Sequence, residues 1–510
     1  MQQGNRRVSY ASPMQHLLLS MAFALTPREP LPPMPLAPTA SAATVDGSPR
    51  LMVKLRDGVR ADAVDGALSP LVHHDVSDLV ARAEARSGRT QPDYGSLYLV
   101  KTKRSSLQSA ASALQADADV EVAWSSPGDV ALPKKPSDDD PAESYLKLQR
   151  YHLAEHGVGS REAWKAGYTG KGIRISDVEY GMNVRHEDIA KGRIDREKGV
   201  KPINPFSEHH DHGTAVMGIA LAQPDKAGIR GIAHGATGGI YPIYTEQHGH
   251  RTADALLKAC GDSDVGDIVM IELQTVAVDG YAPMEVDPDI WMATRTCVDA
   301  GVVIVAAAGN GSQDLDGKGF DFWRERGDSG AILVGAGRGA HGSREAEDFS
   351  NHGKRVDLQG WGSGVFTLGY GDHSMDGDDP NQAYTSRFGG TSSATPIVAG
   401  SAALVQQAAV EKTGKPLEPD ALRDLLRKTG RAHEGSRKVG ALPNVPKAIA
   451  KLKKKKGRDD AGKAGVAKTA EAPASGWHST VFPGLGCATG QGAAGWLLVL
   501  AAGMLARRRR

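Results

Sequence analysis

The sequence is poor in cysteine, in aromatic side chains and in net charge. Its 510 residues include three cysteines and 5% aromatic residues, and the formal net charge is +1. Three cysteines are too few for a disulfide framework. A net charge close to zero gives no general attraction to nucleic acid or to acidic partners. The sequence therefore predicts a protein that folds around a hydrophobic core and does not bind nucleic acid.

Two of the three cysteines occupy similar places in the sequence. Cys260 and Cys297 each lie late in a predicted helix, just before a run of apolar residues. The two side chains could face one another and pair in an oxidising compartment. Because a free cysteine behaves as a small apolar core residue, we expect buried thiols and keep the disulfide as the alternative. Cys487 lies in a segment of different composition.

Residues 1–42 have the composition of an export signal. Two arginines precede an apolar run at 17–25, and a proline-rich stretch then ends in Ala-Ser-Ala at 40–42. The apolar run is too short to span a bilayer as a mature helix. Met14 is an alternative start, and a disordered amino terminus is the alternative to a signal.

Residues 50–128 are predicted to form a small separate α+β unit. Apolar residues alternate with polar ones from Leu51 to Leu55, a second strand is expected at 97–100, and residues 107–114 have helical spacing. The following segment, 129–143, is polar and punctuated by proline, as expected of an exposed and cleavable linker.

Residues 144–452 are predicted to form the main domain. Its apolar runs read as strands buried on both faces and alternate with helical stretches; the runs are 173–178, 239–243, 268–273, 302–308 and 331–335. This pattern predicts a doubly wound α/β fold with a mostly parallel sheet. Functional groups are then expected at the carboxyl ends of the strands.

The carboxyl-terminal part of the chain changes composition abruptly. Residues 453–483 are rich in lysine and alanine and predict a flexible linker. Residues 484–510 contain Cys487, an apolar run at 492–506 and four terminal arginines. An apolar helix followed by a cationic stop is typical of a tail held in a membrane, although this helix is shorter than the ~20 residues that span a bilayer.

Three short segments join a carboxylate, an imidazole and a hydroxyl in one order along the chain. Asp177 and Glu179 follow a predicted strand, His212 opens the second segment, and Ser392 lies within the third at 390–396. A hydroxyl becomes a good nucleophile at neutral pH when an imidazole takes its proton and a carboxylate orients that imidazole. The order acid, histidine, serine is the order found in subtilisin.

Residues 145–450 resemble the subtilisin-like serine peptidases of family S8. The likeness rests on Gly-Thr-Ser-Ser-Ala-Thr-Pro around Ser392, on His212-Gly-Thr, and on the strand that ends before Asn310-Gly. It implies that Ser392 attacks the peptide carbonyl, that His212 shuttles the proton, and that Asn310 donates to the oxyanion. Taken alone, an amino-terminal cap serine and a turn-forming Asn-Gly are the alternatives.

The sequence departs from the family pattern at the acid. Glu179 stands where the family has aspartate, while Asp177 lies two residues earlier on the same strand face. We expect Glu179 to be the acid, because the spacing to Gly181 and His186 is then the family spacing. Asp177 stays open as the second candidate.

A second departure concerns the strand edge that binds substrate in the family. Glu272, Leu273 and Gln274 stand in place of Ser-Leu-Gly. The resemblance implies that these three residues bind substrate, and Glu272 would favour basic substrate residues if its side chain faced the pocket. The neighbours of His212 at 209–211 do not have metal-ligand spacing, so no metal site is expected.

The resemblance extends to the ends of the chain. The 50–128 unit resembles the inhibitory propeptide of subtilisins, with a retained accessory domain as the alternative. The segment 484–510 resembles the sorting tail of myxobacterial surface proteins, with a plain membrane anchor as the alternative. We therefore expect a zymogen with an export signal, which is secreted or held at the cell envelope by a transmembrane or sorting segment in the outer membrane.

The expected activity is that of a serine endopeptidase, a hydrolase whose partners are protein or peptide substrates, its own propeptide and the cell membrane. Its chemistry requires no cofactor, but a structural calcium ion would fit acidic loops such as 314–317. A subtilisin-fold binding or scaffold protein that has lost hydrolysis is the alternative function.

Overall fold

The computed structural model describes residues 50–56, 58–61, 68–100, 107–126, 145–203, 209–224, 228–375 and 378–453. The predicted export signal, the linker at 129–143, the segment from 454 to 483 and the tail at 484–510 lie outside these ranges. All described residues belong to one compact unit, Met1–Lys455.

The amino-terminal part of this unit is a four-stranded antiparallel sheet with two helices. The strand order is β2-β3-β1-β4, and the elements are β1 (Arg50–Leu55), β2 (Leu68–Pro70), α1 (Ser77–Ser87), β3 (Leu97–Val100), α2 (Leu107–Gln115) and β4 (Val120–Ser126). Alternation of apolar residues in β1 buries Leu51, Val53 and Leu55 against α2. These elements have the predicted α+β pattern.

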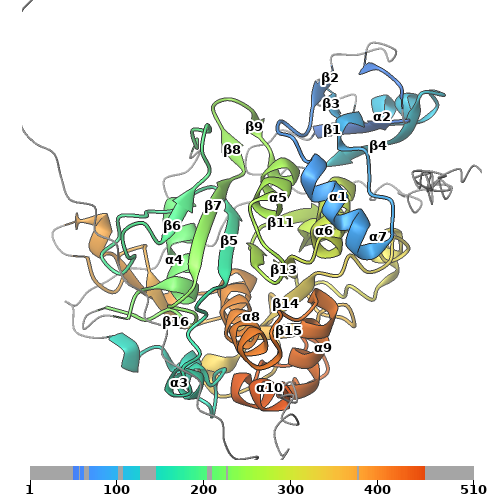
Figure 1. Cartoon of the computed structure of the whole chain (residues 1–510). Coiled ribbons are helices and arrows are strands. Elements are labelled where there is room, and N and C mark those ends of the chain that lie inside the picture. The colour runs from blue at the N-terminus through green and yellow to red at the C-terminus, as the bar shows by residue number, and fades with distance from the viewer. Residues whose placement is uncertain are drawn as a thin grey trace, which may run out of the picture. The chain divides into compact units, whose positions relative to one another are not determined.

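The main domain is built on a seven-stranded parallel sheet of order β15-β14-β13-β10-β5-β7-β6 (Figure 1). Its strands are β5 (Arg174–Glu179), β6 (Ile194–Arg196), β7 (Thr237–Pro242), β10 (Ile268–Ile271), β13 (Val303–Ala307), β14 (Ile332–Gly337) and β15 (Leu358–Trp361). The inner strands are buried on both faces because helices cover both.

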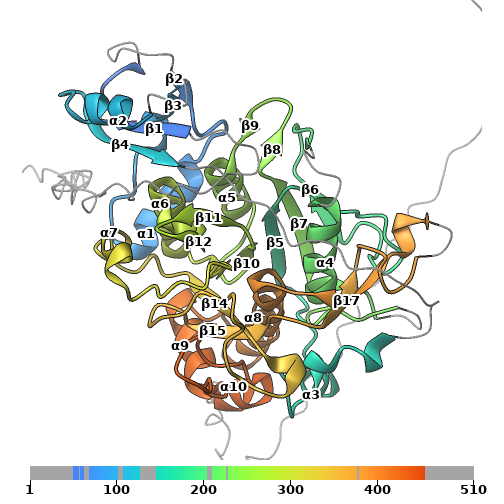
Figure 2. The same cartoon turned by 180° about the vertical axis from the view of Figure 1, so that it is seen from behind.

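Helices are wound on the two faces of the sheet. They are α3 (Ser160–Lys165), α4 (His209–Leu221), α5 (Thr252–Gly261), α6 (Pro288–Asp299), α7 (Asp321–Arg324), α8 (Thr391–Thr413), α9 (Pro419–Thr429) and α10 (Val445–Lys451). Ile175 and Met270 pack with α4 and α8, whereas Val178 and Val269 pack with α5 and α6 on the other face (Figure 2). The predicted doubly wound α/β fold is confirmed.

Three hairpins complete the main domain. They are β8 (Tyr244–Thr245) with β9 (Gly249–His250), β11 (Gln274–Ala277) with β12 (Gly280–Pro283), and β16 (Val365–Leu368) with β17 (Tyr384–Phe388). The first of these follows β7 and the second follows β10, whereas the third lies between β15, the last strand of the main sheet along the chain, and α8.

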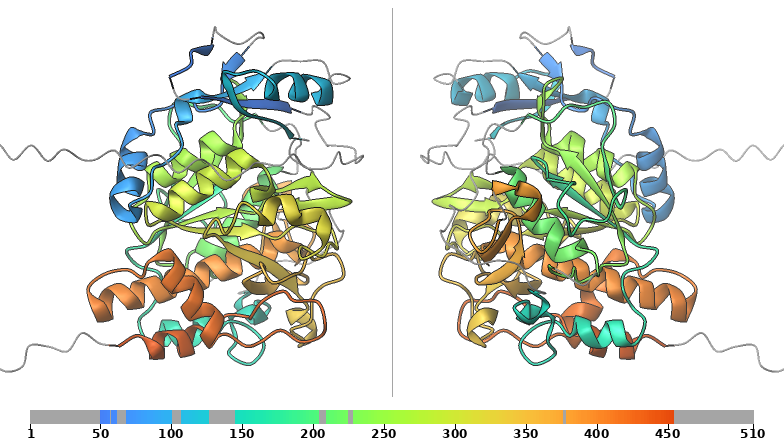
Figure 3. Two further views of the ribbon diagram at one scale, coloured as in Figure 1. Left: turned by 90° about the vertical axis from the view of Figure 1, so that its right-hand side faces the viewer. Right: turned by 90° about the vertical axis from the view of Figure 1, so that its left-hand side faces the viewer.

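The amino-terminal elements pack against α5 and α6 (Figure 3). The Tyr94 hydroxyl is 2.6 Å from the Thr296 hydroxyl, and the Gln91 amide donates to Asp299 at 3.1 Å. His74 Nδ1 lies 2.7 Å from a carboxylate oxygen of Asp254. The contact is therefore polar as well as apolar.

A disulfide joins Cys260 of α5 to Cys297 of α6. The expectation of two free thiols was wrong. Both cysteines are fully buried, as expected of apolar core residues. However, α5 and α6 lie side by side on one face of the sheet and bring the two sulfur atoms together, which the spacing along the chain cannot show.

Candidate active site

The candidate site lies where the order in which strands are added to the sheet reverses. From β5 the chain adds β6 and β7 on one side and then β10, β13, β14 and β15 on the other. In open α/β sheets, such a switch point opens a crevice at the carboxyl ends of the strands. Here β5 ends at Glu179, and Glu272 directly follows β10.

His212 reaches the end of β5 from the first turns of α4. Its Nδ1 lies 2.6 Å from Glu179 Oε2, and both side chains are completely buried. The other carboxylate oxygen of Glu179 accepts the backbone N–H of Tyr180 at 2.7 Å. Because the carboxylate is an acceptor, Nδ1 carries the proton in this contact, and Nε2 has no partner among the described residues.

A glycine lets α4 approach β5 this closely. A Cβ atom at Gly213 would lie 2.2 Å from the carbonyl oxygen of Gly181 and 3.0 Å from the Glu179 side chain. Any larger residue at position 213 would push the helix away and lengthen the contact between His212 and Glu179.

Ser392 lies in the first turn of α8, a 23-residue helix that packs on α4. The preceding Gly390 has a φ of +86°, which glycine adopts without strain. The Ser392 hydroxyl is almost fully buried and lies 3.5 Å from the carbonyl oxygen of Glu272. Its place at a helix amino terminus favours negative charge beside it.

Asn310 follows β13 and is held from two sides. Its side-chain oxygen accepts the Thr391 N–H at 2.8 Å and the Thr391 hydroxyl at 3.1 Å. Its own backbone N–H donates to the Gln274 side-chain oxygen at 2.8 Å. These contacts fix the amide group, and its nitrogen lies 3.3 Å from the Cβ position of Gly390. The donor therefore lies beside the turn that carries Ser392.

Asp177 makes no hydrogen bond to His212. Its carboxyl group contacts that of Glu272 instead, and both side chains are buried. Burial raises the pKa of each carboxyl group well above its usual range. Asp177 raises the pKa of Glu272 further, whereas the hydrogen bond from Glu272 acts in the opposite direction on the pKa of Asp177. Glu179, not Asp177, therefore makes the carboxylate contact with His212.

The predicted substrate edge differs in detail from the expectation. The Glu272 carboxyl group faces Asp177 in the interior, because residues 270 and 272 lie on the face of the sheet that also bears Asp177 of β5. The Glu272 carboxyl group is buried, so the condition on which the predicted preference for basic residues depended is not met. Leu273 is buried, and the Gln274 side chain holds Asn310.

Sequence reasoning missed two contributions to this site. Thr391 and Gln274 hold Asn310, and the pairing of Asp177 with Glu272 was not foreseen. A signal for the pair was present, since two acidic residues occur in the neighbouring apolar runs 173–178 and 268–273.

The described part of the chain contains no group of three His, Cys, Asp or Glu side chains that could hold a metal ion. In the acidic loop at 314–317, Asp314 accepts the N–H of Asp316, and Asp316 accepts that of Lys354. Backbone donors thus reach one carboxylate oxygen of Asp314 and both of Asp316.

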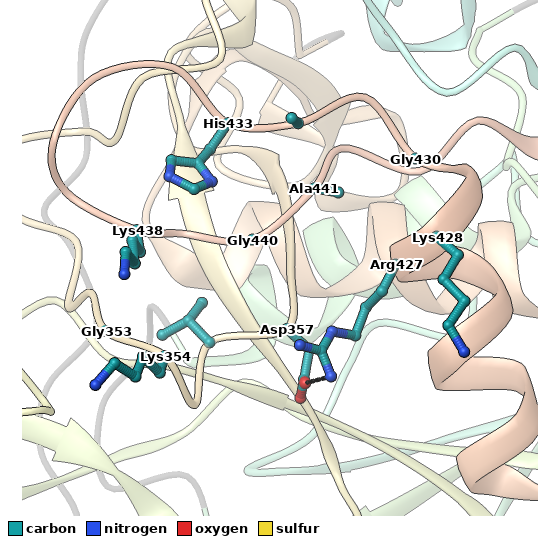
Figure 4. Close-up of a pocket in the computed structure, with 12 residues that line it drawn as sticks. Gly353, Lys354, Asp357, Arg427, Lys428, Gly430, His433, Lys438, Gly440 and Ala441 are labelled. Carbon is teal, nitrogen blue, oxygen red and sulfur yellow. Dashed lines mark ion pairs between the residues drawn. The ribbon is translucent and has the colours of Figure 1, made fainter.

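A second concave region has a cationic lining (Figure 4). It has a volume of about 490 Å³ and lies beside the segment that enters β15. Arg427 points toward Asp357 at 3.5 Å, while Lys354, Lys438 and His433 lie on its other side. None of the three catalytic candidates lines this region, so it is separate from the site around Ser392.

Within the described ranges, every helix is either too short or too polar to cross a lipid bilayer. The apolar run predicted to act as a transmembrane or sorting segment lies outside those ranges.

Comparison with known proteins agrees with this geometry. The profile of the subtilase family, Peptidase_S8, matches residues 170–461, which is more than half of the chain. The major intracellular serine protease of Bacillus subtilis is 26% identical over 280 residues, which cover 53% of this chain and 80% of that protein. Subtilisin E of Bacillus subtilis is 24% identical over 282 residues, covering 54% and 66%.

Two further relatives extend the comparison. The calcium-dependent protease of a Nostoc species is 28% identical over 332 residues, which cover 55% of this chain and 46% of that protein. Among solved structures, the epidermin leader peptide processing serine protease of Staphylococcus aureus superposes with a TM-score of 0.51 at 17% identity, covering 80% of this chain and 99% of that chain. This second likeness shows the fold. The family match, together with the fold, shows that the chain belongs to the subtilase family and is a subtilisin-like serine protease.

Proposed function

We propose that this protein is an exported endopeptidase that cleaves protein or peptide substrates through Ser392, His212 and Glu179. The observation that carries the proposal is the 2.6 Å contact between His212 Nδ1 and Glu179 Oε2. A carboxylate at this atom holds the imidazole with Nε2 unprotonated, which is the form that takes a proton from a serine.

The proposed reaction begins with attack of the Ser392 oxygen on the substrate carbonyl carbon. The hydroxyl proton passes to His212 Nε2, and Glu179 stabilises the imidazolium that forms. The side-chain amide of Asn310 and the backbone N–H of Ser392 donate to the oxyanion. One such donor contributes about 3 kcal/mol of transition-state stabilisation. His212 then protonates the leaving amine, and water releases the acyl group by the reverse sequence.

Glutamate in place of aspartate is compatible with this role. The longer side chain reaches back from the last residue of β5, and the N–H of Tyr180 binds its second oxygen. With one oxygen on Tyr180 and the other on His212, the carboxylate has a defined orientation. The extra methylene therefore does not leave the acid loose.

The amino-terminal elements are proposed to act as an inhibitory propeptide. Their contacts with α5 and α6 include the pair between His74 and Asp254 and the donation of Arg82 to carbonyl oxygens of residues 260 and 263. A cleavage between residues 127 and 144 would separate them from the main domain. We also propose residues 1–42 as the export signal and residues 484–510 as the envelope segment, and the disulfide supports an oxidising compartment.

The fluorophosphonate reaction of the purified protein tests the proposed chemistry, because such a probe labels only an activated serine. We expect labelling of the wild type after removal of the amino-terminal elements, and none of Ser392→Ala. Glu179→Ala should lose labelling, whereas Asp177→Ala should label more slowly. If the processed wild type does not label, a scaffold protein without hydrolysis becomes the better description.

A further inference from the structure

Three acidic side chains meet on one face of the sheet beside His212. Asp177 and Glu179 share a face of β5 because side chains alternate along a strand. Asp177 pairs in register with Met270 of the parallel strand β10, so Glu272, two residues further on, lies on the same face. Only Glu179 contacts the histidine. The other two carboxyl groups need a separate explanation.

Asp177 and Glu272 have no hydrogen-bond donor other than one another. Both are buried, and their four carboxyl oxygens accept no N–H or O–H group of the described residues. Burying an isolated carboxylate is strongly unfavourable, and burying two in contact is more so. If one of the two keeps a proton, its O–H group donates to the other carboxylate, and the pair carries one charge.

The surroundings supply no cation that would remove the need for this proton. The neighbouring strands present Ile240 of β7 and Ala307 of β13 next to the pair. The first turn of α8 contains Ser392 and no acidic or basic residue. Among the described residues, the further titratable group that acts on the pair is thus Glu179 of β5, which itself contacts His212 of α4.

The pair also lies against the nucleophile. The carbonyl oxygen of Glu272 is the described group that accepts the Ser392 hydroxyl, at 3.5 Å. Burial raises the pKa of both carboxyl groups, which favours retention of the shared proton as the pH rises. When that proton is lost, Glu272 and Asp177 repel each other, and the chain around the Glu272 carbonyl must shift.

We propose that Asp177 and Glu272 form a positioning pair that shares one proton, holds the end of β10 against Ser392, and limits activity at alkaline pH when the proton is lost. The proposal rests on the proposed peptidase function. It assigns neither residue a contact with the substrate, because both side chains are buried.

The first test is the pH dependence of peptide hydrolysis by the wild type and by Asp177→Asn and Glu272→Gln. An amide donates to the remaining carboxylate at every pH, so each variant replaces the titrating proton by a fixed donor. We expect the wild-type kcat to fall reversibly at alkaline pH and the fall to move upward by about one pH unit or more in both variants. KM should change little, because the pair does not touch substrate.

Two controls separate this effect from a loss of structure. Glu285→Gln alters another buried carboxyl group, one that is paired with Arg355, and should keep the wild-type alkaline fall. Asp177→Ala removes the hydrogen bond without replacing it, so its kcat should lie about tenfold below that of Asp177→Asn. Thermal unfolding of each variant, followed by circular dichroism, gives the folded fraction.

Infrared difference spectroscopy gives a readout independent of activity. The wild type should keep the carbonyl stretch of a protonated carboxylic acid at mildly alkaline pH, and both amide variants should lack it. Fluorophosphonate labelling of the wild type separates the two proposals. If the wild type labels but both variants lose activity at the same alkaline pH as the wild type, or if the wild type lacks the protonated carboxyl band, the shared proton is ruled out. If the processed wild type never labels, the peptidase function is ruled out instead.

Discussion

Two groups of acidic residues in this protein are neutralised in different ways. Around Arg355, in the segments that enter α6, β14 and β15, one guanidinium contacts Glu285 at 3.2 Å, Asp328 at 3.3 Å and Asp357 at 2.7 Å. Beside His212, Asp177 and Glu272 have no arginine or lysine partner among the described residues. The first group is an ion-pair network, and the second depends on a proton.

The difference between the groups separates stability from function. A permanently charged arginine satisfies carboxylates at every accessible pH and suits a structural role. A shared proton responds to pH and to neighbouring charge, which suits a site where charge changes during a reaction. We call the first group the Arg355 cluster and the second the acid pair.

The largest expected effect is on catalysis, at the acid that contacts His212. Glu179→Gln keeps the shape of the side chain but removes the charge that stabilises the imidazolium and favours the wrong tautomer of His212. We expect kcat to fall about 10⁴-fold, as in other triads that lose their acid, with little change in the urea midpoint. Steady-state kinetics on a peptide substrate measure this. A loss smaller than tenfold would contradict the role of Glu179.

The next effect is on stability, at the centre of the Arg355 cluster. Arg355→Met removes one largely buried cation and leaves the buried Glu285 carboxyl group without a cationic partner, while Asp328 keeps Arg423 and Asp357 keeps Arg427. Breaking a buried ion pair in this way costs about 3–5 kcal/mol. Urea unfolding should show that loss, while kcat per labelled serine stays close to that of the wild type. An equal loss of kcat in the folded protein would show that the two groups are not independent.

A third change tests how much the disulfide between α5 and α6 contributes to stability. These two helices lie on the face of the sheet opposite to α4 and α8. Replacing both Cys260 and Cys297 by alanine removes a crosslink between positions 37 residues apart. The chain-entropy model predicts a loss of about 3–4 kcal/mol at most, and strain or residual structure commonly reduces it. The variant should unfold earlier in urea and label normally at Ser392. Dithiothreitol should lower the wild type to the same midpoint and leave the variant unchanged.

The smallest expected effect is on the pH dependence of the free energy of unfolding, which should differ between the two groups. Burial opposes ionisation of Asp328, but Arg355 and Arg423 outweigh it and lower its pKa to about 2. A depressed pKa contributes stability that is present above about pH 4 and is lost as the pH falls toward 2. Asp328→Asn should therefore flatten the acid limb of the stability curve.

For the acid pair, the change of stability with pH has the opposite sign. Its raised pKa values mean that the folded state binds protons that the unfolded state has released, so stability declines as the pH rises above the unfolded values near 4. Glu272→Gln should flatten that alkaline decline and leave the acid limb unchanged. If Asp328→Asn and Glu272→Gln both flattened the stability curve at the same end of the pH range, the two groups would not differ in the way proposed.

Much of the architecture could be predicted from local pattern. The apolar runs at 173–178 and 268–273 form β5 and β10. Such continuous apolar runs are typical of parallel strands that helices cover on both faces of the sheet. The motifs around His212 and Ser392 predicted where two helices begin. The pairing of Cys260 with Cys297 could not be predicted, because it depends on how α5 and α6 lie against each other.

The sequence by itself determined the family and the parallel sheet, because these depend on residue type, spacing and order. It also supplied His212, Ser392 and Asn310 as candidates for the imidazole, the hydroxyl and the amide. It left Glu179 and Asp177 as alternative partners of His212, and it predicted that Glu272 binds substrate. Only the tertiary structure decided that Glu179 reaches the histidine and that Asp177 meets Glu272. The physical reason is that these contacts depend on the register between β5 and β10 and on the close approach of α4 at Gly213, neither of which is a local property of the chain.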